Sequence, residues 1–314
     1  MQKLVRLVDI VRQFPGKEVV VIGDAMLDEY VHGQVSRISP EAPIPILKAG
    51  KKVHILGGAG NVAANISSLG GKCSLFGFIG DDEAGKIVRS LAEEQRITCY
   101  FGANSRTTLK VRGMCGKNHV SRTDYEDISK KFFTAEEKEL LRASLEKAEI
   151  IVVSDYGKGA VTSDLMEILK DYRAKTIAAP KPENRDIYRQ SGLRLFILNR
   201  EEALKMSEKQ EVGHAAVYLR DVLNSEILIT LGAKGMALFP PGILVPTCAK
   251  EEYDVTGAGD TVLAAAALAL SCDARSERAA ILGNYAAGIA VSKPGTYAVK
   301  LSELEQALKT PETR

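Results

Sequence analysis

The 314-residue chain contains no tryptophan, only four histidines and only five cysteines. Without tryptophan, it lacks the side chain that most readily stacks on bases and on the flat faces of sugars. The cysteines are odd in number, widely spaced and form no Cys-x-x-Cys pair, which argues against a disulfide scaffold and a zinc cluster. The histidines are scattered and have no metal-ligand spacing.

Long apolar runs and an excess of one charge are also missing. The longest apolar run covers residues 262–270, far short of the ~20 residues that span a bilayer. The N-terminal segment lacks the apolar core and cleavage site of a signal peptide. Lysine and arginine total 42 against 40 acidic residues, for a net charge of +2, whereas nucleic-acid binders carry a basic excess or patch. We therefore expect a cytoplasmic protein that binds neither membranes nor nucleic acid.

The chain does contain short β-rich runs that alternate with helical patterns. Hydrophobic residues make up 45% and charged residues 26%, as in globular domains. The alternation predicts an α/β sandwich of three layers, with a mainly parallel sheet between helices, as a single domain over residues 1–314. Strands are predicted at residues 17–23, 73–79, 150–154, 176–179, 195–198 and 227–231. Helices are predicted at residues 58–69, 83–95, 134–147, 163–173, 200–207, 213–223, 257–271, 275–291 and 302–309.

Two segments interrupt this alternation, at about residues 30–56 and 98–122. Apolar and polar residues alternate in both, and the first carries prolines at positions 40, 43 and 45. Both follow strand–helix units at the predicted carboxyl edge of the sheet, where open α/β folds bind ligands. We predict that they form a small β-lid, with two ordinary surface hairpins as the alternative. Their exposed edges allow pairing between copies, so we expect a homodimer through the lid.

The strongest chemical signal is the string DVTGAGD at residues 254–260, which precedes an alanine-rich helix. Gly257, Ala258 and Gly259 let the backbone turn into a helix N-terminus, whose N–H groups and dipole favour an anion. A carboxylate at Asp260 would not suit simple phosphate binding, but it suits a base that takes the proton of an attacking alcohol. We predict that Asp260 is the catalytic base and that the turn stabilises the transferring phosphoryl group.

Four polar residues are candidates for sugar binding. Asp24 and Asp28 follow the first strand, and Asn61 and Asn65 lie four residues apart, which places them on one helical face. Two amides on a helix buried against a sheet indicate a ligand. The alternatives are that Asn61 caps the helix, that Asn65 is solvated, and that Asp28 is an ordinary loop carboxylate.

A set of basic residues in the lid and at one strand end indicates an anionic sugar. Arginine suits bidentate contacts with phosphate. Each member taken singly is equally well explained as a surface charge. The set is Arg37, Lys110, Arg112, Arg122 and Lys158.

These strings resemble the signatures of the ribokinase-like, or phosphofructokinase B, family of carbohydrate kinases. Residues 254–260 resemble its C-terminal signature DTTGAGD, and residues 57–65 resemble its sugar-binding signature, which implies that Gly57 and Gly58 line the sugar. The resemblance implies a ribokinase-like fold and phosphoryl transfer from ATP with Mg²⁺. It implies that Asn199 and Glu202, in an NxxE motif, organise Mg²⁺ through water, and that Asp254 lies near a monovalent cation such as K⁺. The implied cofactor-binding residues are Lys181, Asn199, Glu202, Thr230, Gly232, Gly235, Asn284 and Ala287.

A finer resemblance is to the heptose 7-phosphate kinases of lipopolysaccharide-core precursor synthesis. It is carried by RISPEAPIP at residues 37–45, RTDYE at 122–126 and SDYGKG at 154–159. It implies phosphorylation of D-glycero-β-D-manno-heptose 7-phosphate at the anomeric oxygen, giving the 1,7-bisphosphate, and it adds Asp124 to the substrate-binding residues. Bifunctional members carry a second, nucleotidylyltransferase domain, whose HxGH motif is absent from the sequence. We therefore expect the stand-alone kinase form.

One departure from the family pattern leaves alternatives open. Relatives usually have Asp-Pro-Lys before the NxxE strand, where this chain has Ala179-Pro180-Lys181. The missing carboxylate would lie near the metal and the phosphates, so its loss either weakens Mg²⁺–ATP binding or is tolerated. The alternatives are a kinase of another sugar, sugar phosphate or nucleoside, and a non-catalytic sugar-binding regulator. A dinucleotide-dependent enzyme fits poorly because no G-x-G-x-x-G follows the first strand.

Overall fold

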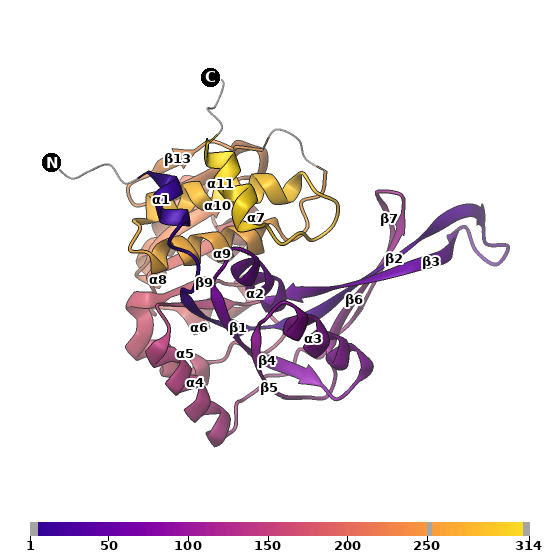
Figure 1. Ribbon diagram of the computed structural model, residues 1–314, viewed down its shortest axis with the longest axis horizontal. Coiled ribbons are helices and arrows are strands. Elements are labelled where there is room, and N and C mark those ends of the chain that lie inside the picture. Colours follow the sequence, from indigo (N-terminus) through magenta and orange to yellow (C-terminus); the bar gives the residue numbers. More distant parts are fainter. Residues whose placement is uncertain (1–5, 250–252, 310–314) are drawn as a thin grey trace.

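The computed structural model describes residues 6–249 and 253–309, which form two sheets and their covering helices (Figure 1). The larger sheet has nine strands in the order β13-β12-β11-β10-β9-β8-β1-β4-β5. Neighbours from β5 to β11 pair in parallel, and β12 and β13 are antiparallel. The strands are β1 (Glu18–Gly23), β4 (Lys72–Gly80), β5 (Thr98–Asn104), β8 (Ile150–Ser154), β9 (Thr176–Ala179), β10 (Leu195–Asn199), β11 (Glu226–Thr230), β12 (Met236–Phe239) and β13 (Ile243–Val245).

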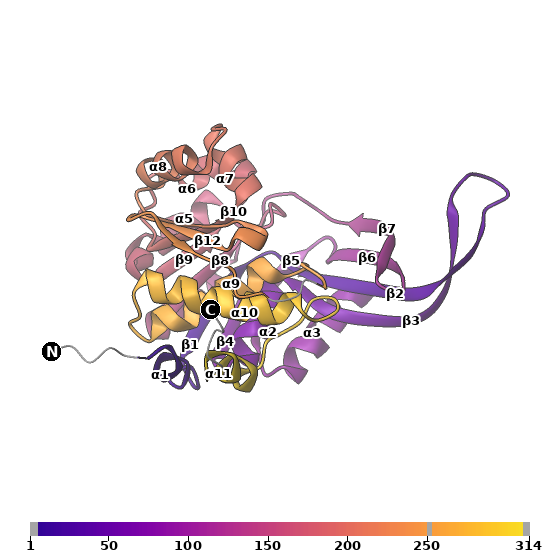
Figure 2. The same ribbon diagram turned by 90° about the horizontal axis from the view of Figure 1, so that it is seen from above.

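Helices cover both faces of this sheet, which confirms the predicted three-layer sandwich (Figure 2). Successive side chains of a strand point to opposite faces, so Val19 and Val21 pack into one core and Val20 and Ile22 into the other. The first core is covered by α1 (Leu7–Val11), α2 (Ala59–Ser68), α3 (Glu83–Glu94), α9 (Ala258–Ser271), α10 (Ser276–Val291) and α11 (Leu301–Lys309). The second is covered by α4 (Ala135–Lys147), α5 (Ser163–Leu169), α6 (Arg185–Tyr188), α7 (Arg200–Ser207) and α8 (Val212–Leu223).

Helix α9 is the most deeply buried of the helices that bear on the site. It packs against α2, α10 and β8, and its side chains are buried from Asp260 to Ser271. Small side chains let its neighbours approach closely. The small residues in its middle are Ala264, Ala265, Ala266, Ala267 and Ala269.

The predicted strands and helices are present, and their ends agree to within one residue with one exception. The helix predicted to reach residue 173 ends at Leu169 and continues as a 3-10 helix over Lys170–Lys175. The short antiparallel strands β12 and β13 were not predicted, because three or four residues carry too little periodicity. Two further 3-10 turns span Pro182–Asn184 and Gly232–Lys234.

The smaller sheet is the β-lid, and it projects to one side of the sandwich (Figure 1). Its strand order is β3-β2-β6-β7, with β2 (Ala25–Ile38), β3 (Pro45–Gly58), β6 (Thr108–Cys115) and β7 (Asn118–Tyr125). The predicted lid segment 98–122 is wrong at its start, because β5 pairs in parallel with β4 in the larger sheet. As an edge strand, β5 is only partly covered, so its sequence alternates like that of a lid strand.

Among the residues that the structure describes, no helix is both long and apolar enough to span a membrane.

Candidate active site

Asp260 lies in the first turn of α9, where α9 meets α2. The N-cap residue, Gly257, has a left-handed φ of 77°. A Cβ atom there would lie 2.8 Å from Asn61 Nδ2. Glycine is therefore required both for the backbone conformation and for the close approach of α2. The turn places the Asp260 carboxylate against Asn61.

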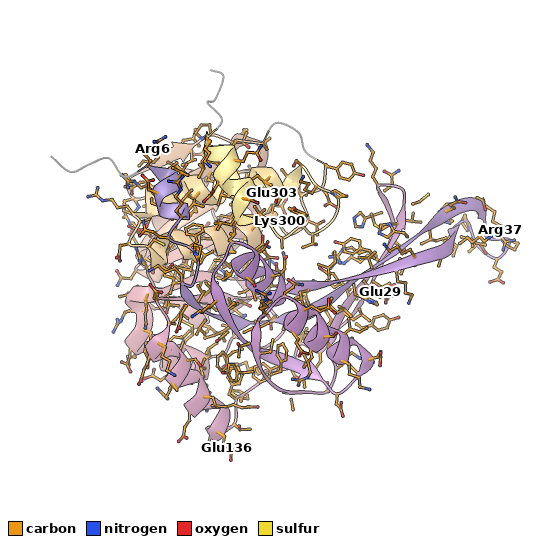
Figure 3. All side chains as sticks on the ribbon, viewed as in Figure 1. Arg6, Glu29, Arg37, Glu136, Lys300 and Glu303 are labelled. Carbon is orange, nitrogen blue, oxygen red and sulfur yellow. The ribbon has the colours of Figure 1, made fainter. Side chains whose placement is uncertain are left out.

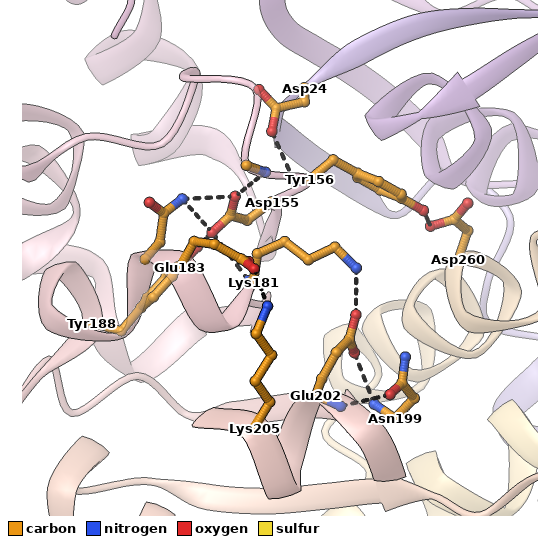
Figure 4. A network of polar contacts seen from close by, with 12 residues as sticks. Asp24, Asp155, Tyr156, Lys181, Glu183, Tyr188, Asn199, Glu202, Lys205 and Asp260 are labelled. Atoms are coloured by element: carbon orange, nitrogen blue, oxygen red, sulfur yellow. Dashed lines mark hydrogen bonds and ion pairs between the residues drawn. The ribbon is translucent and has the colours of Figure 1, made fainter. Parts of the chain in front are cut away.

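The Asp260 carboxylate is buried and accepts one hydrogen bond on each oxygen (Figure 4). Asn61 Nδ2 donates to Oδ2 at 2.8 Å, and the Tyr156 hydroxyl donates to Oδ1 at 2.7 Å. Burial raises the pKa of Asp260 to about 6, although both hydrogen bonds act to lower it. A pKa close to the working pH suits a general base.

Asp24 holds the loop that carries Tyr156. Its carboxylate accepts the backbone N–H groups of Tyr156, Lys158 and Ala160 at 2.7, 3.0 and 3.0 Å. The side chain is buried and its oxygens are engaged by this loop. The prediction that Asp24 contacts the sugar is therefore corrected, because Asp24 fixes residues 156–160 instead.

Asn65 has a similar supporting position behind Asn61. It is fully buried, and its Nδ2 donates to the carbonyl oxygen and Oδ1 of Asn61 at 3.0 and 3.2 Å. Its Oδ1 accepts bonds from Thr261 Oγ1 and the Val299 N–H at 3.3 and 3.2 Å. A side chain without exposed surface offers nothing to a ligand, so the predicted sugar contact of Asn65 is also corrected. Asn61 does not cap α2, since the N-cap is Gly58.

One face of the lid carries a ladder of charged side chains. Asp28 on β2 pairs in register with Lys110 on β6, which pairs with Asp124 on β7. Two residues further along, Arg112 pairs in register with Arg122. Since residues two apart in a strand share a face, these side chains lie on one surface.

Glycine at position 57 leaves room for Asp28. A Cβ atom on Gly57 would lie 2.8 Å from Asp28 Oδ2. On its other oxygen, Asp28 accepts a bond from Arg112 Nη1 at 2.5 Å, and both side chains of this ion pair are buried.

Two more cations of the predicted basic set also have carboxylate partners. Arg122 binds Asp124 through two bonds of 2.8 and 2.6 Å, and Lys158 Nζ lies 2.7 Å from Glu126. With Arg112 on Asp28, three of the predicted cations are neutralised within the chain. The charged face is therefore preorganised by internal ion pairs.

Lys110 and Arg37 differ from these three. Among the described residues, no carboxylate lies within ion-pair distance of Lys110, whose Nζ lies 5.6 Å from the centre of the Tyr156 ring. Burial lowers the pKa of Lys110, and Arg122 lowers it further. Arg37 lies at the outer end of the β2–β3 hairpin (Figure 3), away from the sandwich, whose helix α9 carries Asp260. The prediction that Arg37 reaches the substrate phosphate within its own chain is thus wrong.

A cavity opens beside the first turn of α9, next to Ala258 and Gly259. A Cβ atom on Gly259 would meet nothing within 4 Å, so the start of α9 leaves space for a ligand. Asn284 Nδ2 donates to the Pro246 carbonyl oxygen at 2.6 Å, which holds α10 against the neighbouring segment. All five predicted nucleotide-binding residues from the C-terminal part line the cavity. The predicted lining residues are Thr230, Gly232, Gly235, Asn284 and Ala287, joined by Ala258 and Gly259.

Lys181, Asn199 and Glu202 form a second polar group (Figure 4). Asn199 and Glu202 cap the start of α7 reciprocally, with N–H to oxygen distances of 2.8 and 2.9 Å. The remaining Glu202 oxygen binds the Lys181 ammonium. One carboxylate and one amide suit Mg²⁺ held mostly by water and nucleotide phosphates. Within the described ranges, no cluster of three or more His, Cys, Asp or Glu side chains is placed to hold a metal ion.

Asp254 links the loop before α9 to a second turn. Its Oδ1 accepts the Thr256 N–H at 2.9 Å and its Oδ2 accepts the Gly295 N–H at 3.1 Å. The carboxylate therefore fixes the backbone that leads into Gly257. The monovalent cation expected there stays a prediction.

Tyr156, which donates a hydrogen bond to Asp260, is the site residue that the sequence analysis missed. It stands inside the string SDYGKG, directly after Asp155 at the end of β8. The string identifies a loop at the carboxyl edge of the sheet. The path of this loop, and so the position of Tyr156, depends on Asp24, which lies more than one hundred residues earlier. No local pattern predicts the hydrogen bond to Asp260.

A buried carboxylate in the first turn of a helix, with a cavity beside that turn and a charged lid nearby, is the arrangement expected of a kinase that phosphorylates a sugar hydroxyl. The chain belongs to the pfkB family of carbohydrate kinases, whose family model matches residues 17–303. The bifunctional protein HldE of Caulobacter vibrioides is 38% identical over 95% of the chain, and that of Actinobacillus succinogenes is 38% identical over 94%. The chain spans 65% and 64% of the lengths of these two relatives.

Solved structures confirm the ribokinase-like fold. A putative ribokinase from Agrobacterium tumefaciens superposes with a TM-score of 0.78 at 19% identity, covering 94% of this chain and 98% of that one. Arabidopsis thaliana ribokinase complexed with ribose and ATP superposes with a TM-score of 0.75 at 19% identity, covering 94% and 100%. At these identities the similarity establishes the fold, and the substrate has to be argued from the site.

Proposed function

We propose that the protein transfers the γ-phosphoryl group of ATP to the anomeric hydroxyl of D-glycero-β-D-manno-heptose 7-phosphate, giving the 1,7-bisphosphate. The observation that carries this proposal is the position of Asp260, with the cavity beside Gly259 on one side and the lid face of Asp28 on the other. The choice of heptose phosphate rests on the strings at residues 37–45, 122–126 and 154–159.

In this reaction, Asp260 accepts the proton of the anomeric hydroxyl while that oxygen attacks the γ-phosphorus in line. The backbone N–H groups at the start of α9 stabilise the charge on the transferring phosphoryl group, and one such donor contributes roughly 2.7–4 kcal/mol in other enzymes. Asp28 accepts hydrogen bonds from the sugar. Mg²⁺, held near Asn199 and Glu202 through water, supplies positive charge to the phosphates when bound.

For the distal phosphate of the sugar, we propose Lys110 as the recognising cation, because Arg112, Arg122 and Lys158 already have carboxylate partners. Lys110→Met is expected to raise KM for the sugar phosphate about tenfold or more and to leave KM for ATP unchanged. Lys117→Met, at the exposed β6–β7 turn, is the matched control. An equal rise in KM for the dephosphorylated sugar would rule out recognition of the phosphate by Lys110.

The direct test of the proposal is ADP release with Mg²⁺–ATP and heptose 7-phosphate, beside ribose, fructose phosphates and nucleosides. The chain with Ala179→Asp is measured in parallel, because Ala179 ends β9 where relatives carry a carboxylate. Turnover by both chains supports the proposal, and turnover only with Ala179→Asp means that Ala179 disables an intact site. Sugar binding without turnover in either chain favours the regulator, and turnover with another acceptor overturns heptose 7-phosphate.

We also propose a homodimer that forms through the lid. Ile38 and Ile44, near the tip of the β2–β3 hairpin, are 58% and 57% exposed, and a partner that covers them removes apolar surface from water. Ile38→Glu with Ile44→Glu is expected to give monomers in analytical ultracentrifugation. A dimer that survives both changes would exclude this surface.

A monovalent cation near Asp254 is proposed on family resemblance. Phosphofructokinase-2 from Escherichia coli, solved in complex with potassium, has a similar fold, with a TM-score of 0.73 at 18% identity. Activity in K⁺ compared with a bulky organic cation tests the proposal. Equal rates in both would exclude it.

A further inference from the structure

Both oxygens of the proposed base accept hydrogen bonds from the protein itself. Tyr156 donates to Oδ1 of Asp260 and Asn61 donates to Oδ2. A hydroxyl that gives its proton to Asp260 must come within hydrogen-bond reach of one of these oxygens. Each oxygen keeps a second lone pair, but Asp260 is only 7% exposed and a donor covers each oxygen. Movement of one donor is therefore the direct way to admit the sugar hydroxyl.

Asn61 is the fixed donor of the pair. It lies on α2, is 2% exposed, and its own Oδ1 is held by Asn65. Tyr156 lies in a loop and is only partly buried. Its backbone is held by Asp24, so the movement needed is a rotation of its side chain. The ammonium groups of Lys110 and Lys181 lie 5.6 and 5.1 Å from the centre of its ring.

We propose that Tyr156 guards the catalytic base: its hydroxyl occupies Oδ1 of Asp260 until the acceptor hydroxyl of the sugar displaces it, and so keeps water from that oxygen. The inference rests on the proposed role of Asp260 as the base. In this proposal Tyr156 is a positioning residue: it excludes water from Asp260 and yields to the sugar hydroxyl.

The guard matters because water is a competing acceptor. A water molecule bound to Oδ1 would form a bond from its oxygen to the γ-phosphorus while the bond from that phosphorus to the β–γ bridging oxygen breaks. ADP would leave with the electron pair, and the water proton would pass to Asp260. ATP would thus be hydrolysed without a sugar, and a hydroxyl already seated on the base prevents this.

Tyr156→Phe tests the proposal because it removes one hydroxyl and leaves the ring between Lys110 and Lys181. We expect the ratio of sugar-independent ATP hydrolysis to sugar phosphorylation to rise about tenfold or more, as the loss of a hydrogen bond to a charged group allows. Without nucleotide, we expect the sugar to bind several-fold more tightly, because it no longer competes with the phenol.

Tyr188→Phe is the matched control. The Tyr188 hydroxyl donates to Oδ2 of Asp155 at 3.0 Å, so it also binds a buried carboxylate of the same loop. Removing the Tyr188 hydroxyl disturbs the loop but leaves the hydrogen bond from Tyr156 to Asp260 in place. We expect this variant to keep both the hydrolysis ratio and the sugar affinity of the wild type.

The absence of tryptophan gives a second measurement, because the ten tyrosines dominate the near-ultraviolet spectrum. Sugar binding without nucleotide is expected to give a tyrosine difference spectrum in the wild type and in Tyr188→Phe, and a smaller one in Tyr156→Phe. An unchanged hydrolysis ratio together with weaker sugar binding in Tyr156→Phe would overturn the guard, and so would a spectrum independent of Tyr156. The rate of ATP hydrolysis without sugar is also compared directly between Tyr156→Phe and the wild type, and it should be higher in the variant. That comparison needs no acceptor, so failure of heptose 7-phosphate as acceptor is a separate outcome.

Discussion

Replacing Asp260 with asparagine should make the protein more stable while it removes most of the activity. Burial raises the pKa of Asp260 from 3.8 to about 6. A carboxyl whose folded pKa exceeds its unfolded pKa destabilises the fold at any pH where it is ionised in both states. A difference of about two units corresponds to about 3 kcal/mol. Asp260→Asn keeps the shape without the charge, so the free energy of unfolding should rise by up to about 3 kcal/mol at about pH 8.

The stability gained by Asp260→Asn should depend on pH. The buried Asp260 charge destabilises the wild type less as the pH falls through about 6, and not at all below about 4. Urea denaturation followed by far-ultraviolet circular dichroism at about pH 8 and pH 5 measures both values. In the same samples, ADP release should fall by about 10²–10⁴-fold, the usual contribution of a general base.

Asp82→Asn is the control, because its expected change in the free energy of unfolding has the opposite sign. Despite partial burial, hydrogen bonds from the Thr107 and Gly85 N–H groups, both 2.8 Å long, lower the pKa of Asp82. This variant should lose stability at about pH 8 and less at a pH below the folded pKa. The reasoning fails if Asp260→Asn is no more stable than the wild type at about pH 8, or if its gain is the same at both pH values. Normal turnover would remove Asp260 from the role of base.

Three further predictions concern the same site. The kcat/KM of the wild type should fall about tenfold per pH unit below about pH 6, because only ionised Asp260 accepts a proton, and a pH–rate profile checks this. Arg112→Met leaves the buried Asp28 carboxylate unpaired and should cost about 3–5 kcal/mol in urea denaturation, part of which Asp28→Asn in the same chain restores. Gly57→Ala should raise KM for the sugar and not for the nucleotide in steady-state assays, because its Cβ displaces the Asp28 carboxylate.

The parts of the site that local sequence encodes were predictable. The continuous apolar run of β1 predicts a buried parallel strand, and the glycines before Asp260 predict a helix N-terminus. The cavity beside Gly259 also lies where the C-terminal motifs indicate. In each case a few adjacent residues determine the backbone, so the signal is contained in the string itself.

The parts that depend on distant residues were not predictable. Whether Asn65 meets a ligand or supports Asn61 depends on Val299, which lies more than two hundred residues away. Whether Lys110 is free depends on which cation binds Asp124: the register of β6 and β7 sets Lys110 opposite Asp124, but Arg122 binds that carboxylate. Neither the composition of the chain nor the spacing of these residues determines which partner each side chain binds.

The alanine-rich middle of α9 has a consequence for how the site moves. Alanine has no side-chain rotamers, so the helix that carries Asp260 has few ways to repack between α2 and α10. The rearrangements that admit ligands should therefore fall on the lid and on the side chain of Tyr156, because the backbone of that loop is fixed by Asp24. Amide hydrogen exchange should be slowest along residues 262–270 and faster in β7. The enzyme would then work by moving its surroundings around a stationary base.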